Sequence, residues 1–390
     1  MKKIISVLTA TRAEYGLLKP VIDHLNNMEE FDVRVVVTGA HLSPEFGLTY
    51  RDIENHGIHI DERIEILLSA DTPSSISKSM GLAMISFADY FNRLKPDMLI
   101  VLGDRYETLS VALAAMNQRI PIAHLHGGEI TEGAVDDAIR HAITKMSYLH
   151  FTSTEEYRRR VIQLGEQPDR VFCVGAIGIE NIYCQELLTK SELEDSLQFV
   201  LDKPFALVTF HPVTLENNTS AEQFENLLKA CTLYPELQFI FTKANADTDG
   251  RIINKMMDDF VKEHENTKVF SSLGSQRYLS ALKYCSMVLG NSSSGLLEAP
   301  SFGIPTINIG NRQKGRIQAD SVINCMPVVN EIKAAMDLAL SNEFREKAGC
   351  TVNPYGDGNT ASKIADVIKS FLEEPINIQK KFYDYIPDKE

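Results

Sequence analysis

The fold is decided by the stretch MLIVLGDRYETLSVALAAMNQRIPIAHL, residues 98–125. It opens with five apolar residues, Met98–Leu102, and closes with a second short apolar run, Ile122–Leu125. Between them, Thr108–Asn117 carries apolar side chains at helical spacing. A short apolar strand, a helix and another apolar strand predict a parallel pair of strands with the helix crossing over one face of the sheet.

The same alternation continues over the rest of the chain. Short apolar runs recur on both sides of this stretch, and we expect them to form buried strands: Ile4–Leu8, Val33–Thr38, His150–Thr152, Val171–Val174, Ala206–Thr209, Gln238–Phe241, Lys268–Phe270, Met287–Leu289 and Thr306–Ile309. Amphipathic helical patterns separate them. The chain is therefore predicted to be an α/β protein with parallel sheets covered by helices on both faces.

The length and the order of these patterns predict two domains. A chain of 390 residues fits two or three domains at roughly 150 residues each. The alternation restarts after the polar stretch Glu186–Lys203, so we expect two doubly wound, Rossmann-like domains, residues 1–185 and 186–360. The segment 361–390, with its helical pattern Ala361–Leu372, is expected to pack back onto the first domain. Ligands of open α/β sheets bind beyond the carboxyl ends of the strands, so two such domains facing each other are expected to bind a ligand in the cleft between them.

Composition excludes several classes of protein. Hydrophobic residues make up 44% and charged residues 24%, which is typical of a soluble globular enzyme. The net charge of −14 argues against nucleic acid or an anionic membrane as the partner. No apolar run reaches the length of about 18 residues that a membrane helix needs, and the apolar start Ile4–Ala10 fits a buried first strand better than a signal peptide. Six scattered cysteines without a CxxC pair indicate reduced thiols and a cytoplasmic protein.

The loop after Ile122–Leu125 is the densest in chemical groups. Glycines and titratable residues follow this run: His126, Gly127, Gly128, Glu129, Asp136, Asp137, Arg140 and His141. Asp136 and Arg140 are neighbours on one helix face, four residues apart. So many titratable groups after one strand predict an acid/base site. Two alternatives stay open: a metal site made by His124, His126 and Glu129, and a surface ion pair between Asp136 and Arg140.

Other strand ends carry candidate binding groups with ordinary alternatives. Arg12 follows the first strand, where it could meet a phosphate or simply be a surface arginine. Asp104 follows Met98–Leu102 and would point into the cleft, unless it only caps the next helix. His211 follows the first strand of the second half, where a histidine suits phosphate binding or proton transfer, or could merely bond to a backbone carbonyl.

The segment Ser292–Gly295 predicts an anion cradle. Backbone N–H groups and hydroxyls at the start of a helix attract phosphate. Glu298, one turn later, could bond two ribose hydroxyls, and Arg312 could add positive charge. Together these groups describe a site for a nucleotide-sugar diphosphate, with a serine-rich helix cap that binds no ligand as the alternative.

Six motifs occur in a characteristic order along the chain: Thr11-Arg12-Ala13-Glu14-Tyr15, Gly103-Asp104-Arg105, Gly127-Gly128-Glu129, Asp136-Asp137-Ala138-Ile139-Arg140-His141, His211-Pro212-Val213-Thr214 and Gly290-Asn291-Ser292-Ser293. In this they resemble the hydrolysing UDP-N-acetylglucosamine 2-epimerases of the bacterial sialic-acid pathway type. The resemblance runs from about residue 4 to residue 370. It implies the two-domain GT-B fold and a homo-oligomer, either a dimer or a tetramer.

The resemblance also implies a reaction. Members of this family convert UDP-N-acetylglucosamine and water to N-acetylmannosamine and UDP, which feeds nonulosonic (sialic) acid biosynthesis, and they need neither NAD nor a catalytic metal. Anti elimination of UDP gives a 2-acetamidoglucal, to which water adds with the opposite configuration at C2. This chemistry needs at least two acid/base groups on different faces of the sugar ring.

The resemblance assigns residues to these steps. The catalytic set that it implies is Asp104, His126, Glu129, Asp136, Arg140 and His211. The set that binds the UDP-sugar is Arg12, His41, Arg105, His141, Asn245, Ser292, Ser293, Ser294, Gly295, Glu298 and Arg312. Asp104 and Asp136 are the candidates for proton transfer, and His211 would stabilise the charge on the leaving diphosphate.

One position departs from the family pattern. The family usually has His-x-Glu-Gly-Gly-Glu, and here His126 stands in place of the first glutamate. A histidine can still act as a base near neutral pH, or Glu129 takes that role. The departure raises UDP-N,N'-diacetylbacillosamine, of the legionaminic-acid route, as the alternative substrate. A GT-B glycosyltransferase and a nucleotide-sugar sensor without turnover are the other functions that these residues allow.

Overall fold

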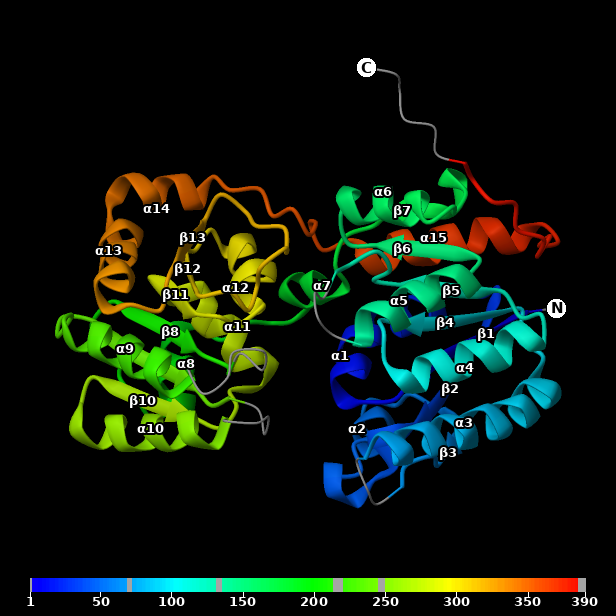
Figure 1. Cartoon of the computed structure of the whole chain (residues 1–390), viewed down its shortest axis with the longest axis horizontal. Helices are drawn as coiled ribbons and strands as arrows, with labels where there is room; N and C mark the ends of the chain where they lie inside the picture. The colour runs from blue at the N-terminus through cyan, green and yellow to red at the C-terminus, as the bar shows by residue number, and fades with distance from the viewer. Residues whose placement is uncertain (1, 69–71, 131–134, 213–219, 245–249, 385–390) are drawn as a thin grey trace. The chain divides into compact units, whose positions relative to one another are not determined.

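The structure is a computed structural model that describes residues 2–68, 72–130, 135–212, 220–244 and 250–384 (Figure 1). The chain forms two units. Unit 1 comprises Met1–Asn181 and Tyr355–Glu390, and unit 2 comprises Ile182–Pro354. Each unit has one sheet in which every strand pair is parallel. This confirms the predicted α/β class with two Rossmann-like domains.

The sheet of unit 1 has seven strands in the order β3-β2-β1-β4-β5-β6-β7. Their bounds are β1 Lys3–Thr9, β2 Phe31–Thr38, β3 Ile60–Ile64, β4 Met98–Leu102, β5 Ile122–Leu125, β6 Leu149–Thr152 and β7 Val171–Cys173. The strand order reverses between β1 and β4. At such a switch point the loops leaving the two strands diverge to opposite faces, and this opens a crevice for a ligand.

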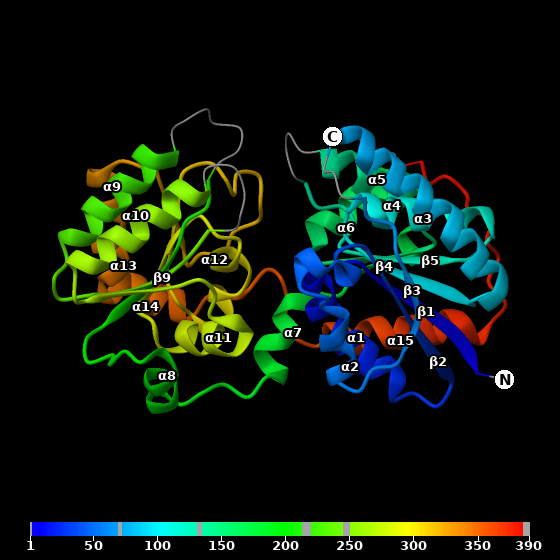
Figure 2. The ribbon, with the colours of Figure 1, turned by 90° about the horizontal axis from the view of Figure 1, so that it is seen from below.

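Helices cover both faces of this sheet (Figures 1 and 2). One core contains the side chains of α1 Arg12–Asn26, α2 Tyr50–Asn55 and α15 Thr360–Glu373. The other contains those of α3 Pro73–Leu94, α4 Tyr106–Asn117 and α5 Val135–Met146. Two further helices, α6 Glu155–Gln163 and α7 Ile177–Cys184, follow β6 and β7, and short 3-10 turns lie at Gly39–Leu42 (η1), Pro44–Phe46 (η2) and Pro168–Arg170 (η3).

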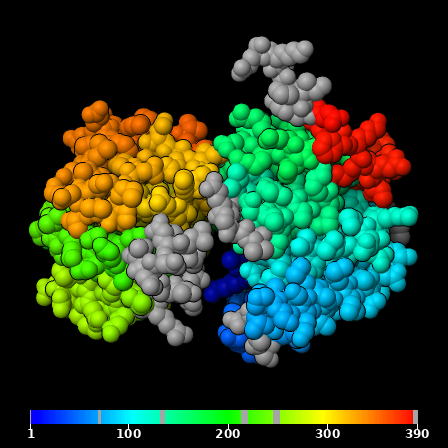
Figure 3. Space-filling model, in the orientation of Figure 1, coloured from blue at the N-terminus to red at the C-terminus, as the bar shows by residue number. Residues whose placement is uncertain are grey.

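The end of the chain belongs to unit 1. Helix α15 lies beside α1 (Figure 2) and contributes fully buried side chains such as Ile364 to the same core. Beyond α15, Lys380 Nζ donates to the carbonyl oxygens of Lys145 (2.9 Å) and Ser147 (2.7 Å). Figure 3 shows this C-terminal segment, in red, on the surface of unit 1.

The sheet of unit 2 has six strands in the order β10-β9-β8-β11-β12-β13. The strands are β8 Phe205–Thr209, β9 Gln238–Thr242, β10 Thr267–Phe270, β11 Met287–Gly290, β12 Thr306–Ile309 and β13 Val322–Cys325. The helices are α8 Lys190–Leu197, α9 Ser220–Thr232, α10 Gly250–Glu263, α11 Gly274–Tyr284, α12 Ser294–Leu297, η4 Ala299–Phe302, α13 Val329–Leu340 and α14 Asn342–Gly349. Here the switch point lies between β8 and β11, so the loops after these two strands are placed for a ligand.

Among the residues that the structure describes, no helix is long and apolar enough to cross a membrane.

Candidate active site

Asp104 and Arg140 form the centre of the candidate site in unit 1. Asp104 follows β4, and Arg140 lies in α5 with only 6% of its surface exposed. Arg140 Nη2 donates to Asp104 Oδ2, and Nη1 donates to the carbonyl oxygen of Glu129 at 2.7 Å. Because Arg140 is buried against Asp104, the alternative of a surface ion pair on α5 is wrong.

The pKa of the Asp104 carboxyl lies above its ordinary value. Burial of the carboxyl raises the pKa, the Arg140 guanidinium lowers it, and the negative charges of Asp136 and Glu129 raise it further. A carboxyl with a raised pKa can accept and return a proton closer to neutral pH than an exposed aspartate can.

His126 and Glu129 form a second acid/base pair at the end of β5. His126 Nδ1 lies 3.0 Å from Glu129 Oε1, and Ser153 Oγ donates to the same oxygen at 3.1 Å. The backbone N–H of Ile177 donates to His126 Nε2 at 3.3 Å. In the neutral ring the proton therefore sits on Nδ1 and points at Glu129. His126 holds this position with φ +65°, a left-handed conformation that is uncommon outside glycine and recurs at functional sites.

Close packing requires a glycine at position 128 of this loop. A Cβ on Gly128, which has φ +80°, would lie 2.4 Å from the carbonyl oxygen of Tyr157 and 2.9 Å from Val161 Cγ2. The loop therefore lies directly against α6. Arg160 of that helix also donates to the Gly128 carbonyl at 2.6 Å.

Three further residues of unit 1 that were predicted to bind the UDP-sugar are Arg105, Arg12 and His41. Arg105 Nη2 donates to Glu107 Oε1 at 2.8 Å. Arg12 is largely exposed at the start of α1, with Nε 3.3 Å from an Asp52 carboxylate oxygen. His41 is fully buried, with its ring nitrogens 3.0 Å from Thr9 Oγ1 and 2.8 Å from Thr49 Oγ1. Burial lowers the pKa of His41 to about 4, so the ring is uncharged.

The remaining residues of the α5 motif lie at its first two turns. Asp136 is exposed in the first turn, where its charge acts on Asp104. His141 Nε2 lies 3.5 Å from Asp137 Oδ2. Among the described residues, no three His, Cys, Asp or Glu side chains gather in an arrangement that could hold a metal ion.

Sequence patterns alone missed several residues that shape this part of unit 1. Glu14 Oε2 accepts from the backbone N–H groups of Ala10 (2.7 Å) and Thr11 (3.1 Å). Its Oε1 lies 3.9 Å from Arg105 Nε. Glu107, with 1% of its side chain exposed, anchors Arg105 from the other side. The only available signal was the position of both glutamates in the first turn of a helix that follows a central strand.

In unit 2, Asn291 connects three of the loops at the switch point. The His211 backbone N–H donates to Asn291 Oδ1 at 2.7 Å, and Asn291 Nδ2 donates back to the His211 carbonyl at 2.8 Å. Arg312 Nη1 donates to the Asn291 carbonyl at 3.0 Å. The structure thus brings together His211, Arg312 and the Ser292–Gly295 segment. Asn291 lies within the quoted motif but was not singled out as a site residue.

The serine segment makes a single helical turn. Helix α12 has four residues, and a Cβ on Gly295 would lie 2.6 Å from Thr306 Cγ2, so the turn packs tightly on β12. Tyr278 Oη donates to Ser294 Oγ at 2.6 Å, and Ser294 Oγ in turn donates to Glu298 Oε2. Burial raises the pKa of Glu298. Tyr278 was also missed, because a tyrosine in the middle of α11 gives no sign of its partner on another helix.

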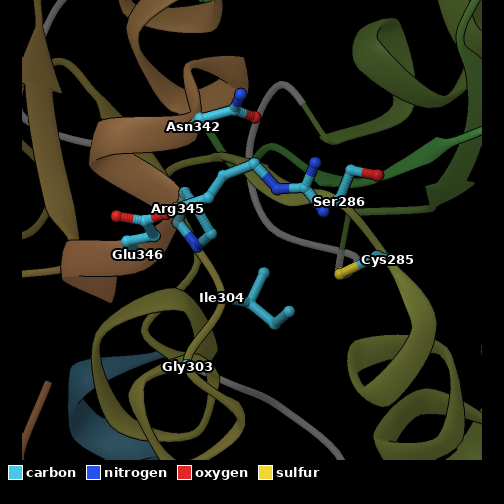
Figure 4. Close-up of a pocket in the computed structure, with 8 residues that line it drawn as sticks. Cys285, Ser286, Gly303, Ile304, Asn342, Arg345 and Glu346 are labelled. Carbon is cyan, nitrogen blue, oxygen red and sulfur yellow. The ribbon is translucent and has the colours of Figure 1, made fainter. Parts of the chain in front are cut away.

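Asn245, which the resemblance places at the UDP, lies outside the described residues, as do Val213 and Thr214 of the His211 motif. Unit 2 also has a pocket of about 340 Å³, shown in Figure 4. Its lining comes from α14 and from the residues just before β11 and β12: Cys285, Ser286, Gly303, Ile304, Pro305, Asn342, Arg345 and Glu346. This pocket lies at the amino ends of those strands, away from the Ser292–Gly295 segment.

Comparison with known proteins relates the whole chain to one family. A family model described as UDP-N-acetylglucosamine 2-epimerase matches residues 23–369. The GDP/UDP-N,N'-diacetylbacillosamine 2-epimerase (hydrolyzing) of Campylobacter jejuni subsp. jejuni serotype O:2 is 42% identical over 384 residues, which cover 98% of this chain and 99% of that one. The polysialic acid biosynthesis protein P7 of Escherichia coli is 40% identical over 389 residues, covering 100% and 98%. The UDP-N,N'-diacetylbacillosamine 2-epimerase (hydrolyzing) of Legionella pneumophila subsp. pneumophila is 34% identical over 370 residues, covering 95% and 96%.

A solved structure shows the same fold. The UDP-GlcNAc 2-epimerase from Neisseria meningitidis, crystallised with UDP-GlcNAc, superposes with a TM-score of 0.76 over 95% of this chain and 100% of that chain, at 21% identity. The two Rossmann-like domains described above are those of the GT-B fold, as predicted.

Proposed function

The chain belongs to the UDP-N-acetylglucosamine 2-epimerase family, and from this premise we propose that it is a hydrolysing 2-epimerase whose substrate is UDP-N,N'-diacetylbacillosamine. The observation that carries the proposal is the 42% identity to the Campylobacter enzyme, which extends over nearly the full length of both chains. The Legionella relative is named for the same substrate.

UDP-N-acetylglucosamine is the second candidate substrate. The E. coli polysialic acid protein, at 40% identity, favours it, because N-acetylmannosamine is the sugar that the sialic-acid route requires. The two substrates share the UDP group and the 2-acetamido group. They differ at C4, where the diacetamido sugar has an acetamido group, and at C6, where it lacks the hydroxyl.

The proposed reaction has two steps. In the first, the bond from C1 to the UDP oxygen breaks while a base removes the C2 proton, giving UDP and a 2-acetamidoglucal. In the second, water supplies a hydroxyl to C1 and an acid delivers a proton to C2 from the opposite face. The sum is UDP-sugar and water going to UDP and the C2-epimeric free sugar.

We assign the proton transfers to the carboxyl groups of unit 1. Asp104 has a raised pKa and is held by Arg140, which suits a group that must both take and return a proton. Both ring nitrogens of His126 are engaged, one with Ile177 and the other with Glu129. This arrangement supports Glu129 rather than His126 as the second proton-transfer group, with Asp136 as the third candidate.

We assign UDP binding to the switch point of unit 2. Ser292 and Ser293 are partly exposed at the start of α12, where hydroxyls and backbone N–H groups can bind a diphosphate. His211 and Arg312 are held beside them through Asn291, and both can stabilise the charge that develops on the departing UDP.

Proton NMR in D2O tests the proposal. The purified protein is incubated separately with UDP-N,N'-diacetylbacillosamine and with UDP-N-acetylglucosamine. We expect release of UDP together with a free sugar of manno configuration that carries deuterium at C2, faster with the diacetamido substrate. A faster reaction with UDP-N-acetylglucosamine would transfer the assignment to the second candidate. Transfer to an acceptor without release of free sugar would support a glycosyltransferase, and tight binding without turnover would support a sensor.

A further inference from the structure

We propose that His124 is a positioning residue for Asp104: it holds the peptide that leads into Asp104 and ties this peptide to the helix that carries Arg140. The inference rests on the proposed function and deepens it, because it explains what aligns the acid/base carboxyl. His124 lies on β5, next to β4, in register with Val101.

The ring of His124 joins two segments of the candidate site. Its Nε2 lies 2.8 Å from the carbonyl oxygen of Gly103, and its Nδ1 lies 3.2 Å from Thr144 Oγ1. A carbonyl oxygen only accepts, so Nε2 carries the ring proton and Nδ1 is an acceptor. Thr144 Oγ1 also lies 3.0 Å from the carbonyl oxygen of Arg140, one turn earlier in α5, so its single hydroxyl proton is shared between His124 Nδ1 and that carbonyl. One ring thereby links the loop after β4 to the helix of Arg140.

The loop that His124 holds is also fixed at the preceding peptide, where the Gly103 N–H donates to the Leu125 carbonyl oxygen at 3.0 Å, whereas His124 acts on the next peptide. Gly103 has φ +72°, and a Cβ built on it would meet nothing within 4 Å, so side-chain packing does not restrain this residue. The Gly103 carbonyl belongs to the peptide whose nitrogen is that of Asp104. A hydrogen bond to this carbonyl therefore sets the plane of that peptide, and with it the direction in which Asp104 leaves the backbone toward Arg140.

A third segment, the His126–Glu129 loop, packs against the same ring. A Cβ on Gly127 would lie 3.2 Å from His124 Nδ1 and 3.2 Å from Thr144 Oγ1, so the His126–Glu129 loop packs directly over this pair. His124 has no exposed surface and cannot touch a substrate. Burial lowers its pKa to about 3, although the hydrogen bond to the Gly103 carbonyl raises it, and the Arg140 charge is one of the smaller contributions to the lowering. The ring therefore stays neutral at working pH and acts through its geometry.

His150 provides a matched control for this proposal. It lies directly opposite His124 on the neighbouring strand β6, and it too has no exposed surface. Its Nε2, however, lies 3.0 Å from Glu166 Oε2, and Glu166 is bonded to Lys145 and Lys380. Removing the His150 ring should disturb the fold about as much as removing the His124 ring, without releasing Gly103 or Thr144.

The experiment compares three His124 variants with one His150 variant in the full-length protein. His124→Leu removes both ring nitrogens. His124→Gln places an amide N–H where Nε2 stood and can restore the bond to Gly103. His124→Asn reaches only the level of Nδ1 and serves as the loss variant if the leucine protein does not fold. His150→Leu is the control. We measure kcat and KM with the faster substrate, the Kd of UDP by calorimetry, and folding by circular dichroism.

Misalignment of Asp104 should lower kcat and leave substrate and UDP binding unchanged. For His124→Leu and His124→Asn we expect kcat to fall by about ten-fold to a hundred-fold, with KM and the Kd of UDP within about two-fold of wild type. His124→Gln should recover a clear part of kcat, and His150→Leu should keep kcat within about two-fold even where its melting temperature falls. The proposal is overturned if both loss variants keep wild-type kcat, if glutamine is no better than asparagine, or if His150→Leu loses as much kcat as His124→Leu.

A second readout separates this proposal from the proposed function. If the wild-type protein turns over neither substrate, the proposed function fails, but the position of Asp104 can still be followed. The ¹³Cγ resonance of Asp104, assigned through Asp104→Asn, is titrated in wild type, His124→Asn and His124→Gln. We expect its pKa to change in the asparagine variant and to return toward wild type in the glutamine variant. Identical titration curves in all three proteins would refute the role of His124.

Discussion

At the scale of single residues, the candidate site depends on one carboxyl whose environment differs from that of an ordinary surface aspartate. Asp104 is partly buried, is contacted by Arg140 and feels two further negative charges. Asp104→Asn keeps the shape of this side chain but removes its ability to take a proton. We expect kcat to fall by about a hundred-fold or more, while the Kd of UDP, measured by calorimetry, stays within about two-fold. Retained turnover would remove Asp104 from the mechanism.

The sequence singled out candidate site residues, but it did not indicate which side chains and backbone groups they contact. The dense group of titratable residues after Ile122–Leu125 predicted an acid/base site at that strand end, and the structure does bring Arg140 and Glu129 together there. The contact between Arg140 and Asp104 joins residues 36 positions apart. It depends on the adjacency of β4 and β5 and on the direction of α5, which no local spacing encodes.

At the scale of elements, the start of α1 combines a helix cap with a buried acid. Thr11 and Glu14 form a capping box, in which Thr11 Oγ1 accepts from the Glu14 N–H and the Glu14 carboxylate accepts from the Thr11 N–H. Burial raises the pKa of Glu14 to about 7, although bonds from the backbone of Ala10 and the charge of Arg105 lower it. The carboxyl that makes this cap therefore takes up a proton near pH 7, well above the pH at which an exposed glutamate does.

The sign of the resulting pH dependence follows from the raised pKa. The folded state binds the proton of Glu14 more tightly than the unfolded state, so this contribution to stability is fully present below about pH 4.5 and is lost as pH rises through about 7. Glu14→Gln keeps an acceptor for the cap and has no charge to bury. We expect this variant to be more stable than wild type at pH 8 by about 1–3 kcal/mol, and to lose that advantage at pH 4.5. Denaturant unfolding at both pH values is the measurement, and a less stable variant at pH 8 would contradict it.

Two edge strands, β3 and β13, were not predicted because neither contains a continuous apolar run. Strand β3, Ile60–Ile64, carries three charged residues in succession, and one of them, Asp61, pairs with Arg34 of β2 at 3.0 Å. Strand β13, Val322–Cys325, is only partly buried along its length. Edge strands face water along one side and need no continuous apolar sequence. The central strands do need one, and for β4, β5 and β12 the predicted bounds are those of the structure.

At the scale of the whole molecule, the chain builds unit 1 from two separate segments with all of unit 2 between them. Ile364 of α15 is fully buried in the core that α1 and the first sheet share. We expect Ile364→Ala to lower the stability of unit 1 by about 2–5 kcal/mol. Calorimetry with and without UDP checks this. The substitution should lower the unfolding temperature of unit 1, and UDP should raise the unfolding temperature of unit 2. One transition that responds to both would mean that the units unfold together.

The alternation of strands and helices predicted two parallel-sheet domains because each buried strand leaves its own local pattern. It showed less about how the chain passes between the units. Gly175 and Gly356 approach so closely that a Cβ on Gly356 would lie 3.0 Å from the Gly175 Cα, and Ala176 N donates to the Tyr355 carbonyl at 2.6 Å. This pairing of two distant segments arises from tertiary packing, and neither segment has a sequence motif that predicts the contact.

The placement of α15 has a consequence for how the protein is made. About 190 residues separate Asn181 from the end of α15, which corresponds to roughly 10 to 40 s of translation. During that interval the first segment of unit 1, Met1–Asn181, has left the ribosome with the apolar surface that α15 will cover still open to water. Unit 2 is complete first, although it comes later in the chain. During synthesis the chain therefore passes through a stage in which unit 2 is complete and unit 1 still lacks α15. At this stage the exposed apolar surface of unit 1 favours aggregation or binding by a chaperone.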